Sequence, residues 1–476
     1  MSQIQTIFKN FSWLMVSQIL TSICAFVWTI LIGRYLGVSD YGIMNFAISF
    51  TGILGITMDL GISTHIIRHI ATDFDSAAKY LGNAIPLKSI FSILTFILAL
   101  IILILMNCNE ITIQITLLFT IERIFTSIIG LFNGSLQAVE EGKYQAIGNI
   151  LLNSLLLIFI LISITGNFGL YGITLSYLIA NFFVIIIQYL AVKKRITKPK
   201  FEFDREFCKK ITIYSIPFAL TSFFGTILSS IDMVMLTKMV SSYANGIYSS
   251  SYKLIAVFTT FYGVYSAVIF PVMSRFYKNE KDLLVISLEK SIKYLLLIII
   301  PISFSTMIYS NDIIVLFFGQ KYSAASSVLS ILIWTLPLGF IGGPCMNLLN
   351  ASHKERFLTL TFMIAAIFNA LLNLFIIPRY SYNGAAVTTI LSDLLNTLLV
   401  IYGVYKINAI PNKKLYKDVF KIFSASVILY IILSILNLNM WVALPVGIII
   451  YFAIIILIKT FDNEDKYVIK EILGKN

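Results

Sequence analysis

The lysine and arginine residues of this 476-residue chain are sorted between alternate gaps in a series of long apolar segments. Of the 35 cations, 29 fall in every second gap, 4 fall in the intervening gaps, and 2, Arg123 and Lys253, lie inside apolar segments. Short cytoplasmic loops of multi-pass membrane proteins retain Lys and Arg in this way. The pattern therefore predicts an all-helical protein of the cell membrane, with many spans and with both termini in the cytoplasm.

The composition agrees with a membrane environment. Hydrophobic residues make up 58% of the chain and charged residues 12%, about half the charged fraction of a soluble domain. Residues 144–192 carry no charged side chain, and Gly166–Asn167 divides this run into two spans joined by a tight turn. The net charge is +12, and the cationic residues lie next to the spans. This position indicates contact with membrane lipids at the inner surface, and we expect no nucleic acid partner.

Turn residues and charge runs divide the chain into fourteen expected spans. These spans are 12–33, 41–62, 85–106, 111–133, 145–165, 170–192, 211–236, 246–271, 291–311, 324–350, 357–377, 383–405, 418–437 and 440–459. The first is longer than the core of a signal peptide, so we expect it to be retained as a helix. The short outward loops leave no room for an extracytoplasmic catalytic domain.

The sequence also repeats itself. Three pairs of segments match in one order, namely 34–43 with 238–247, 136–144 with 349–357, and 169–178 with 383–391. Because six spans is an even number, the two copies share one orientation and form parallel repeats about an axis along the membrane normal. We therefore expect six-helix lobes at 1–205 and 206–410, and an appended helix pair with a cytoplasmic tail at 411–476.

Several short motifs resemble the polysaccharide exporter, or O-antigen flippase, family of the multidrug/oligosaccharidyl-lipid/polysaccharide superfamily. They are Arg34-Tyr-Leu-Gly37 with Tyr41-Gly42, Asp59-Leu-Gly61 followed by Arg68, Asp232 before Gly246-Ile-Tyr248, and Phe318-Gly319-Gln-Lys-Tyr322. The resemblance extends over the whole chain. It implies two lobes around a central cavity that faces the cytoplasm and the outside in turn, and an oligosaccharide on a polyprenyl (pyro)phosphate as the substrate.

Charged residues within the spans are the first candidates for function, because an unpaired charge in hydrocarbon costs several kcal/mol. Arg123 lies near the middle of its span, and the adjacent Glu122 does not face it on the same helix. Arg123 therefore either binds substrate phosphate in the cavity, for which a guanidinium is suited, or forms an ion pair with another helix. Asp232 and Lys253 lie at comparable depths and either pair with each other or serve transport.

Other candidates lie at the ends of spans. Arg34 and Lys238 occupy equivalent positions in the two repeats, where they either receive phosphate at the outer mouth or stabilise helix C-termini. Asp59, His65 and Arg68 cluster at the inner end of the second span. The substrate-binding candidates are Arg123, Arg34, Lys238, Lys253 and Arg68, and the ion-coupling candidates, for Na⁺ or H⁺, are Asp59, Asp232, Asp393 and Glu122.

No enzymatic chemistry is expected. The chain lacks a Walker loop and a nucleophile elbow, and neither its four cysteines nor its three histidines have zinc-binding spacing. We therefore expect no cofactor, no metal centre and no catalytic residue. The proline and glycine residues of the tenth span either form a hinge or reflect the ordinary frequency of these residues in membrane helices; they are Pro337, Gly339, Gly342, Gly343 and Pro344.

Two alternatives to a flippase remain. The first is a cation-coupled multidrug extruder of the same superfamily, whose members typically have twelve spans. The appended pair favours lipid-linked cargo instead, because it offers the acyl tail a groove. The second is a membrane glycan polymerase or ligase, which usually carries a large outward loop with catalytic residues.

Overall fold

The computed structural model describes residues 3–197, 199 and 201–461. Every regular element in these ranges is helical, and none is a strand. The α-helices are α1 (Gln3–Asp59), α2 (Ile62–Thr72), α3 (Ala77–Leu105), α4 (Glu110–Ala138), α5 (Gly142–Thr165), α6 (Gly169–Arg195), α7 (Arg205–Met239), α8 (Ser242–Asn279), α9 (Lys281–Ile308), α10 (Ser310–Phe318), α11 (Ala325–Leu332), α12 (Thr335–Ala351), α13 (Glu355–Lys406), α14 (Lys413–Leu436) and α15 (Met440–Leu457). Two 3-10 turns, η1 (Phe74–Ser76) and η2 (Gln320–Tyr322), complete the set.

Eleven helical segments in the described ranges are long and apolar enough to cross a membrane. Two of them are interrupted at places where the sequence predicts a turn. Within α1, Gly37 has φ 74° and ψ 176°, a conformation that glycine adopts without steric cost. Within α13, Ser381 has φ 51° and ψ −136°. A single non-helical residue therefore separates helices for which we expected a loop.

The helix ends follow from local sequence. The side chains of Asn109, Asp204 and Asn439 accept hydrogen bonds from the first backbone N–H groups of α4, α7 and α15, which have no partner within their helix. Asn167 has a positive φ of 51°, which asparagine tolerates better than most residues, in the turn between α5 and α6. The predicted turn at Gly166–Asn167 is thus confirmed.

The tenth expected span differs from the prediction. Residues 324–350 form two helices, α11 and α12, interrupted at Ile333–Trp334, before the proline and glycine residues that suggested a hinge. Pro337 lies in the first turn of α12, where a missing N–H breaks no intrahelical bond, and Pro344 is accommodated inside the helix. The short helices α2 and α10 were not expected either.

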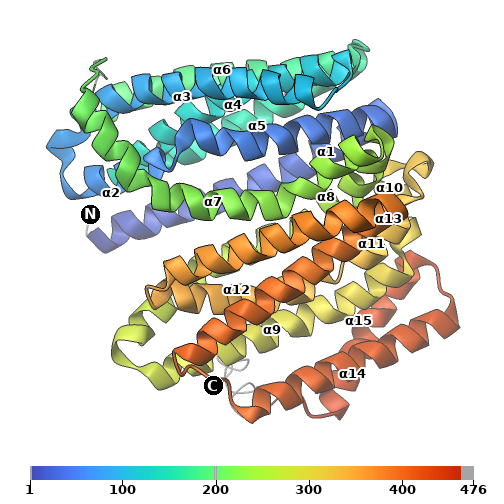
Figure 1. Cartoon of the computed structure of the whole chain (residues 1–476). Helices are drawn as coiled ribbons and strands as arrows, with labels where there is room; N and C mark the ends of the chain where they lie inside the picture. Colours follow the sequence, from blue (N-terminus) through green and yellow to red (C-terminus); the bar gives the residue numbers. More distant parts are fainter. Residues whose placement is uncertain (1–2, 198, 200, 462–476) are drawn as a thin grey trace. The chain divides into compact units, whose positions relative to one another are not determined.

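The chain forms two compact units. The first comprises residues 1–253 and 366–385, in which α1 and α3–α7 lie side by side along one direction (Figure 1). Its α1 packs against α3, α4, α5, α6 and α7, so α1 forms the centre of this unit. A buried cluster that includes Ile66, Leu81 and Phe132 packs α2, α3 and α4 together.

The second unit comprises residues 254–365 and 386–476. Its α9 packs against α12 and α14, and α14 packs against α15. The Lys293 ammonium lies 2.7 Å from an Asp418 carboxylate oxygen and donates to the Thr460 carbonyl at 2.9 Å. Lys293 thereby ties the appended helices to α9.

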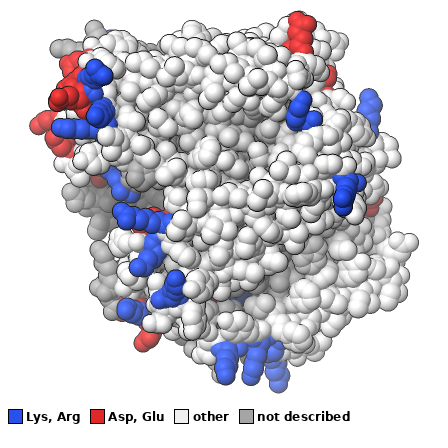
Figure 2. All heavy atoms as spheres, viewed as in Figure 1, with Lys and Arg blue, Asp and Glu red and all other residues white. Residues whose placement is uncertain are grey.

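Charged side chains lie mainly toward the ends of the helices in each unit, and an uncharged band lies between them (Figure 2). Two cations depart from the predicted pattern of loop cations. Lys88 and Lys293 are buried inside α3 and α9, and each is paired with a carboxylate. Three cations of the pattern's final cluster (Lys466, Lys470 and Lys475), together with Lys198 and Lys200, lie outside the described residues.

Candidate functional site

Arg123 extends from α4 across the surface of α1. A Cβ atom placed on Gly55 would lie 3.3 Å from the Arg123 Cγ and Cδ atoms, and one placed on Gly52 would lie 3.5 Å from Nη2. Because these two glycines, three residues apart, have no side chains, the Arg123 side chain packs close to the backbone of α1. The Arg123 Nε atom is buried and has no hydrogen-bond partner among the described residues.

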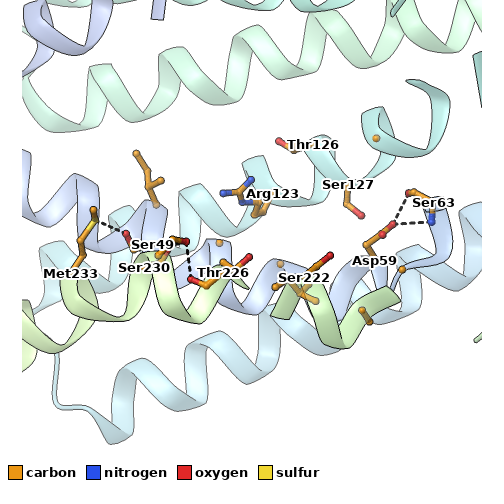
Figure 3. A pocket seen from close by; sticks show the side chains of 18 of the residues that line it. Ser49, Asp59, Ser63, Arg123, Thr126, Ser127, Ser222, Thr226, Ser230 and Met233 are labelled. Atoms are coloured by element: carbon orange, nitrogen blue, oxygen red, sulfur yellow. Dashed lines mark hydrogen bonds between the residues drawn. The ribbon is translucent and has the colours of Figure 1, made fainter. Parts of the chain in front are cut away.

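A cavity of about 520 Å³ in the first unit surrounds this guanidinium. Figure 3 shows Arg123 in its middle, with Asp59 and Ser63 to one side and Ser49 and Met233 to the other. Residues of α1, α2, α4, α7 and the start of α8 form the walls. Its polar lining consists of Ser49, Asp59, Ser63, Thr64, Arg123, Thr126, Ser127, Ser222, Thr226, Ser229, Ser230, Tyr252 and Lys253.

The cavity carries an excess of positive charge. Among the described residues, Asp59 is the one carboxylate in the lining, and the Lys88 ammonium pairs with it at 2.5 Å. Lys88 is 0% exposed, and its ammonium also donates to the Ser63 hydroxyl at 2.9 Å and to the Ser127 carbonyl at 2.7 Å. Its three donors are therefore all used. Arg123 and Lys253 remain as the cations available to an anionic ligand.

A smaller cavity of about 180 Å³ adjoins Arg123 and is also within the first unit. Glu122 lines it, together with Trp28, Tyr177, Arg123 and Lys253. Glu122 Oε1 accepts hydrogen bonds from Thr126 at 2.7 Å and from the Asn181 amide at 2.9 Å. The adjacent Arg123 makes no ion pair with this carboxylate among the described contacts, as the helix geometry predicts.

Asp232 lies in a separate buried polar cluster and is 2% exposed. Its carboxylate accepts hydrogen bonds from the Tyr248 hydroxyl at 2.9 Å and from the Asn373 amide at 2.5 Å, and Asn373 also donates to Asn369 at 2.9 Å. The pairing of Asp232 with Lys253 stays a prediction. Lys253 faces both cavities.

The other predicted candidates lie elsewhere. Arg34 and Lys238 are exposed and line neither cavity, and the Lys238 ammonium donates to the Met106 carbonyl at the C-terminal end of α3. Arg68 is exposed on α2. Asp393 lies in the second unit. Of the candidate residues, Arg123, Lys253, Asp59 and Glu122 line the two cavities. Arg34, Lys238, Arg68 and Asp393 line neither.

His65 lines neither cavity. Its ring packs on His69, with 4.4 Å between ring centroids, and stacks on Tyr214 at 6.1 Å. Burial lowers the pKa of His65, and the nearby His69 and Arg68 lower it further by repelling a second positive charge.

The sequence analysis missed several residues of this region. Lys88 was counted among the loop cations, although it neutralises Asp59. The hydroxyls of Ser222, Thr226 and Ser230 recur every fourth residue on α7 and therefore line one face, a spacing that the sequence itself displays. Asn373 carried no signal of its contact with Asp232, because the two residues are far apart in the chain.

Comparison with solved structures shows the fold first. The chain superposes on "Lipid II flippase MurJ, inward closed conformation" with a TM-score of 0.77, covering 94% of this chain and 98% of that one at 18% identity. At this identity the likeness establishes the fold alone, a bundle of long apolar helices.

Sequence comparison then gives the family. The family model "Polysaccharide biosynthesis protein" matches residues 7–277, more than half of the chain, and a model named MatE matches residues 217–375. The chain belongs to this polysaccharide biosynthesis family of the multidrug/oligosaccharidyl-lipid/polysaccharide superfamily, which confirms the resemblance seen in the sequence.

Two curated relatives are similar over most of their length. The "Capsular polysaccharide biosynthesis protein CapF" of Staphylococcus aureus is 27% identical, with 84% of this chain and 99% of the relative covered. The "Probable low-salt glycan biosynthesis flippase Agl15" of Haloferax volcanii is 24% identical, with 77% and 76% covered.

Proposed function

We propose that this protein flips a polyprenyl-(pyro)phosphate-linked oligosaccharide from the cytoplasmic to the outer leaflet by alternating access. The observation that carries the proposal is the 520 Å³ cavity, in which Arg123 and Lys253 face a wall of serine and threonine hydroxyls. A guanidinium binds phosphate through two parallel hydrogen bonds, and an ammonium adds a second positive charge. The hydroxyls suit the hydroxyl groups of a glycan.

Similarity to CapF and Agl15 supports a substrate from cell-surface polysaccharide or glycoprotein biosynthesis. In the second unit, an apolar cavity of about 280 Å³ lies between α9, α12, α13 and α14, lined by residues such as Leu296, Ile401 and Leu415. Its apolar lining, to which the appended helix α14 contributes, is suited to a prenyl chain.

The proposed topology has fourteen spans with both termini in the cytoplasm. The interruptions at Gly37 and Ser381 divide two of the eleven candidate spans, and α9, with 28 residues, adds another. The proposed repeats are 1–205 and 206–410, followed by the appended residues 411–476. The distribution of Lys and Arg supports the orientation.

The proposed energy source is an ion gradient. Asp232, Asn369, Asn373 and Tyr248 offer carboxylate, amide and hydroxyl oxygens in one buried cluster, and hard cations such as Na⁺ prefer oxygen ligands. Asp393 remains a second candidate. Asp59 is a weaker one, since the Lys88 ammonium occupies the position that a free cation would take.

A multidrug extruder is the second candidate function, because the MatE model matches residues 217–375. The charge of the cavity argues against it. Cationic drugs require an unpaired carboxylate, whereas Asp59 is paired and the remaining charges, Arg123 and Lys253, are positive.

A deletion strain tests the proposal. Without the protein, one lipid-linked glycan should accumulate on the cytoplasmic face of the membrane, and the wild-type gene should restore its appearance outside. Normal distribution of every lipid-linked glycan, together with new sensitivity to cationic drugs, would instead establish the extruder. Loss of glycan polymerisation with normal outward movement would indicate a polymerase or ligase.

A further inference from the structure

The two cavities of the first unit share a wall. Arg123 and Lys253 line the large cavity on one side and, on the other, the 180 Å³ cavity that we call the Glu122 chamber. The chamber is bounded by Trp28, Asn45, Glu122 and Tyr177 from α1, α4 and α6. Ile48 also lines both cavities, so a charge that binds in the large cavity acts on Glu122 across these three side chains.

The chamber is lined by polar atoms that protein groups do not satisfy. The Trp28 indole N–H, the Asn45 carbonyl oxygen, the Tyr177 hydroxyl and Arg123 Nε are buried and without hydrogen-bond partners among the described residues. An unsatisfied buried polar group destabilises the fold, and the chamber's volume fits several water molecules at about 30 Å³ each. This lining suits a small polar pocket through which protons move.

Glu122 is the one carboxylate of the chamber lining among the described residues. The charged and titratable groups that face it there are Arg123 on α4, Lys253 on α8, Tyr41 on α1 and Tyr177 on α6. The lining contains no titratable side chain of α2, α3 or α5 in the described ranges. The two cations stabilise the ionised carboxylate, and they also disfavour entry of a metal cation.

We propose that Glu122 takes up one proton when a phosphate group binds Arg123 and Lys253, and releases it when the phosphate leaves. The proposal rests on the proposed function, because it assigns the phosphate to the large cavity. A bound phosphate carries about two negative charges and neutralises the cations that hold Glu122 ionised. The carboxylate then combines with a proton from water to form the neutral acid, and the reverse step returns that proton.

This exchange links transport to protons through binding free energies. Thermodynamic linkage requires that protonation of Glu122 strengthen phosphate binding by the same factor by which phosphate strengthens protonation. Thr126 and Asn181 keep Glu122 on the chamber side, so Arg123 stays available to the phosphate. Glu122 therefore acts as a positioning and coupling residue and does not itself touch the substrate.

The test uses the full-length protein in lipid nanodiscs and farnesyl sulfate as the probe. A sulfate ester keeps its single charge as pH changes, so any pH dependence belongs to the protein. For the wild type, the affinity should fall as pH rises through the titration of Glu122, by up to about tenfold per pH unit for one linked proton. Glu122→Gln keeps the shape and the acceptor for Thr126, and should bind equally tightly at every pH.

A matched control and a direct measurement complete the test. Glu110→Gln changes an exposed carboxylate at the start of the same helix and should keep the wild-type slope. In weakly buffered solution, wild-type protein should take up protons from a pH indicator when the probe binds, which needs no variant.

The outcomes separate the coupling from the function. A wild type that binds the probe without pH dependence or proton uptake, or a Glu122→Gln protein that keeps the slope, would overturn the coupling and leave the phosphate site intact. Equal binding of farnesol and farnesyl sulfate, unaffected by Arg123→Ala, would overturn the phosphate site and the coupling with it.

Discussion

Gly42 of α1 and Gly246 of α8 form a reciprocal helix contact. A Cβ atom on Gly42 would lie 1.8 Å from the Ser242 carbonyl oxygen, and one on Gly246 would lie 2.0 Å from the Val38 carbonyl oxygen. In the sequence repeat, Gly42 aligns with Gly246 and Val38 aligns with Ser242. The same two aligned positions of each repeated segment therefore meet in this contact, which lies within the first unit.

Because the two helices are in such close contact, adding one methyl group at either glycine should strongly destabilise the protein. Gly42→Ala or Gly246→Ala should lower the free energy of unfolding by at least about 1–3 kcal/mol, because backbone atoms must move to admit the Cβ. Gly225→Ala is the control, since nothing lies within 4 Å of its added Cβ. Thermal unfolding in detergent measures all three, and equal midpoints for Gly42→Ala and Gly225→Ala would show that the contact is not tight.

The sequence predicts features that depend on neighbouring residues, and it does not predict contacts between residues that are far apart in the chain. The turn at Gly166–Asn167 was readable because it depends on neighbouring residues only. Arg123 and Glu122 were identified because a charge inside an apolar run demands a partner or a cavity. The partners themselves were not readable, since Lys88 meets Asp59, and Asn373 meets Asp232, only through the packing of distant helices.

Lys88 and Asp59 provide a second prediction. Lys88→Met leaves the Asp59 carboxylate without its counter-ion, which costs about 3–5 kcal/mol for a fully buried pair. Asp59 is 30% exposed, so we expect a loss toward the lower end of that range. The double variant Lys88→Met/Asp59→Asn should regain most of the stability, and Lys79→Met, which removes an exposed cation of the same helix, should cost about 1 kcal/mol at most. A double variant no more stable than Lys88→Met would rule out the ion pair as the cause.

His65 gives a prediction for pH. Its folded pKa lies below the unfolded value of about 6.5, so the folded state holds the ring neutral while the unfolded state takes up a proton. Stability is therefore complete above the unfolded pKa and falls as pH drops from there through the folded pKa. His65→Gln should remove this part of the pH dependence of the melting temperature, and an unchanged profile would assign it to other groups.

The proposed topology predicts which residues reach each side of the membrane. In a cysteine-free background, single cysteines at Asn109 and Asn439 should react with an impermeant reagent from outside, and one at Lys413 only from inside. Asn109 and Asn439 are helix N-caps, so each substitution is expected to cost about 1 kcal/mol, which folded protein should tolerate. Labelling of Lys413→Cys from outside would reverse the orientation.

Arg123 distinguishes phosphate binding from a structural role. Arg123→Lys keeps the charge but loses the bidentate geometry, so transport should fall although the protein reaches the membrane in normal amounts. Arg123→Ala should fall further, with about 2–5 kcal/mol lost from phosphate binding. If Arg123 serves mainly to balance Glu122, Arg123→Ala should instead be unstable, and Arg123→Ala/Glu122→Gln should regain both stability and transport. Transport that stays lost in a stable double variant would mean that the guanidinium is needed for the substrate itself.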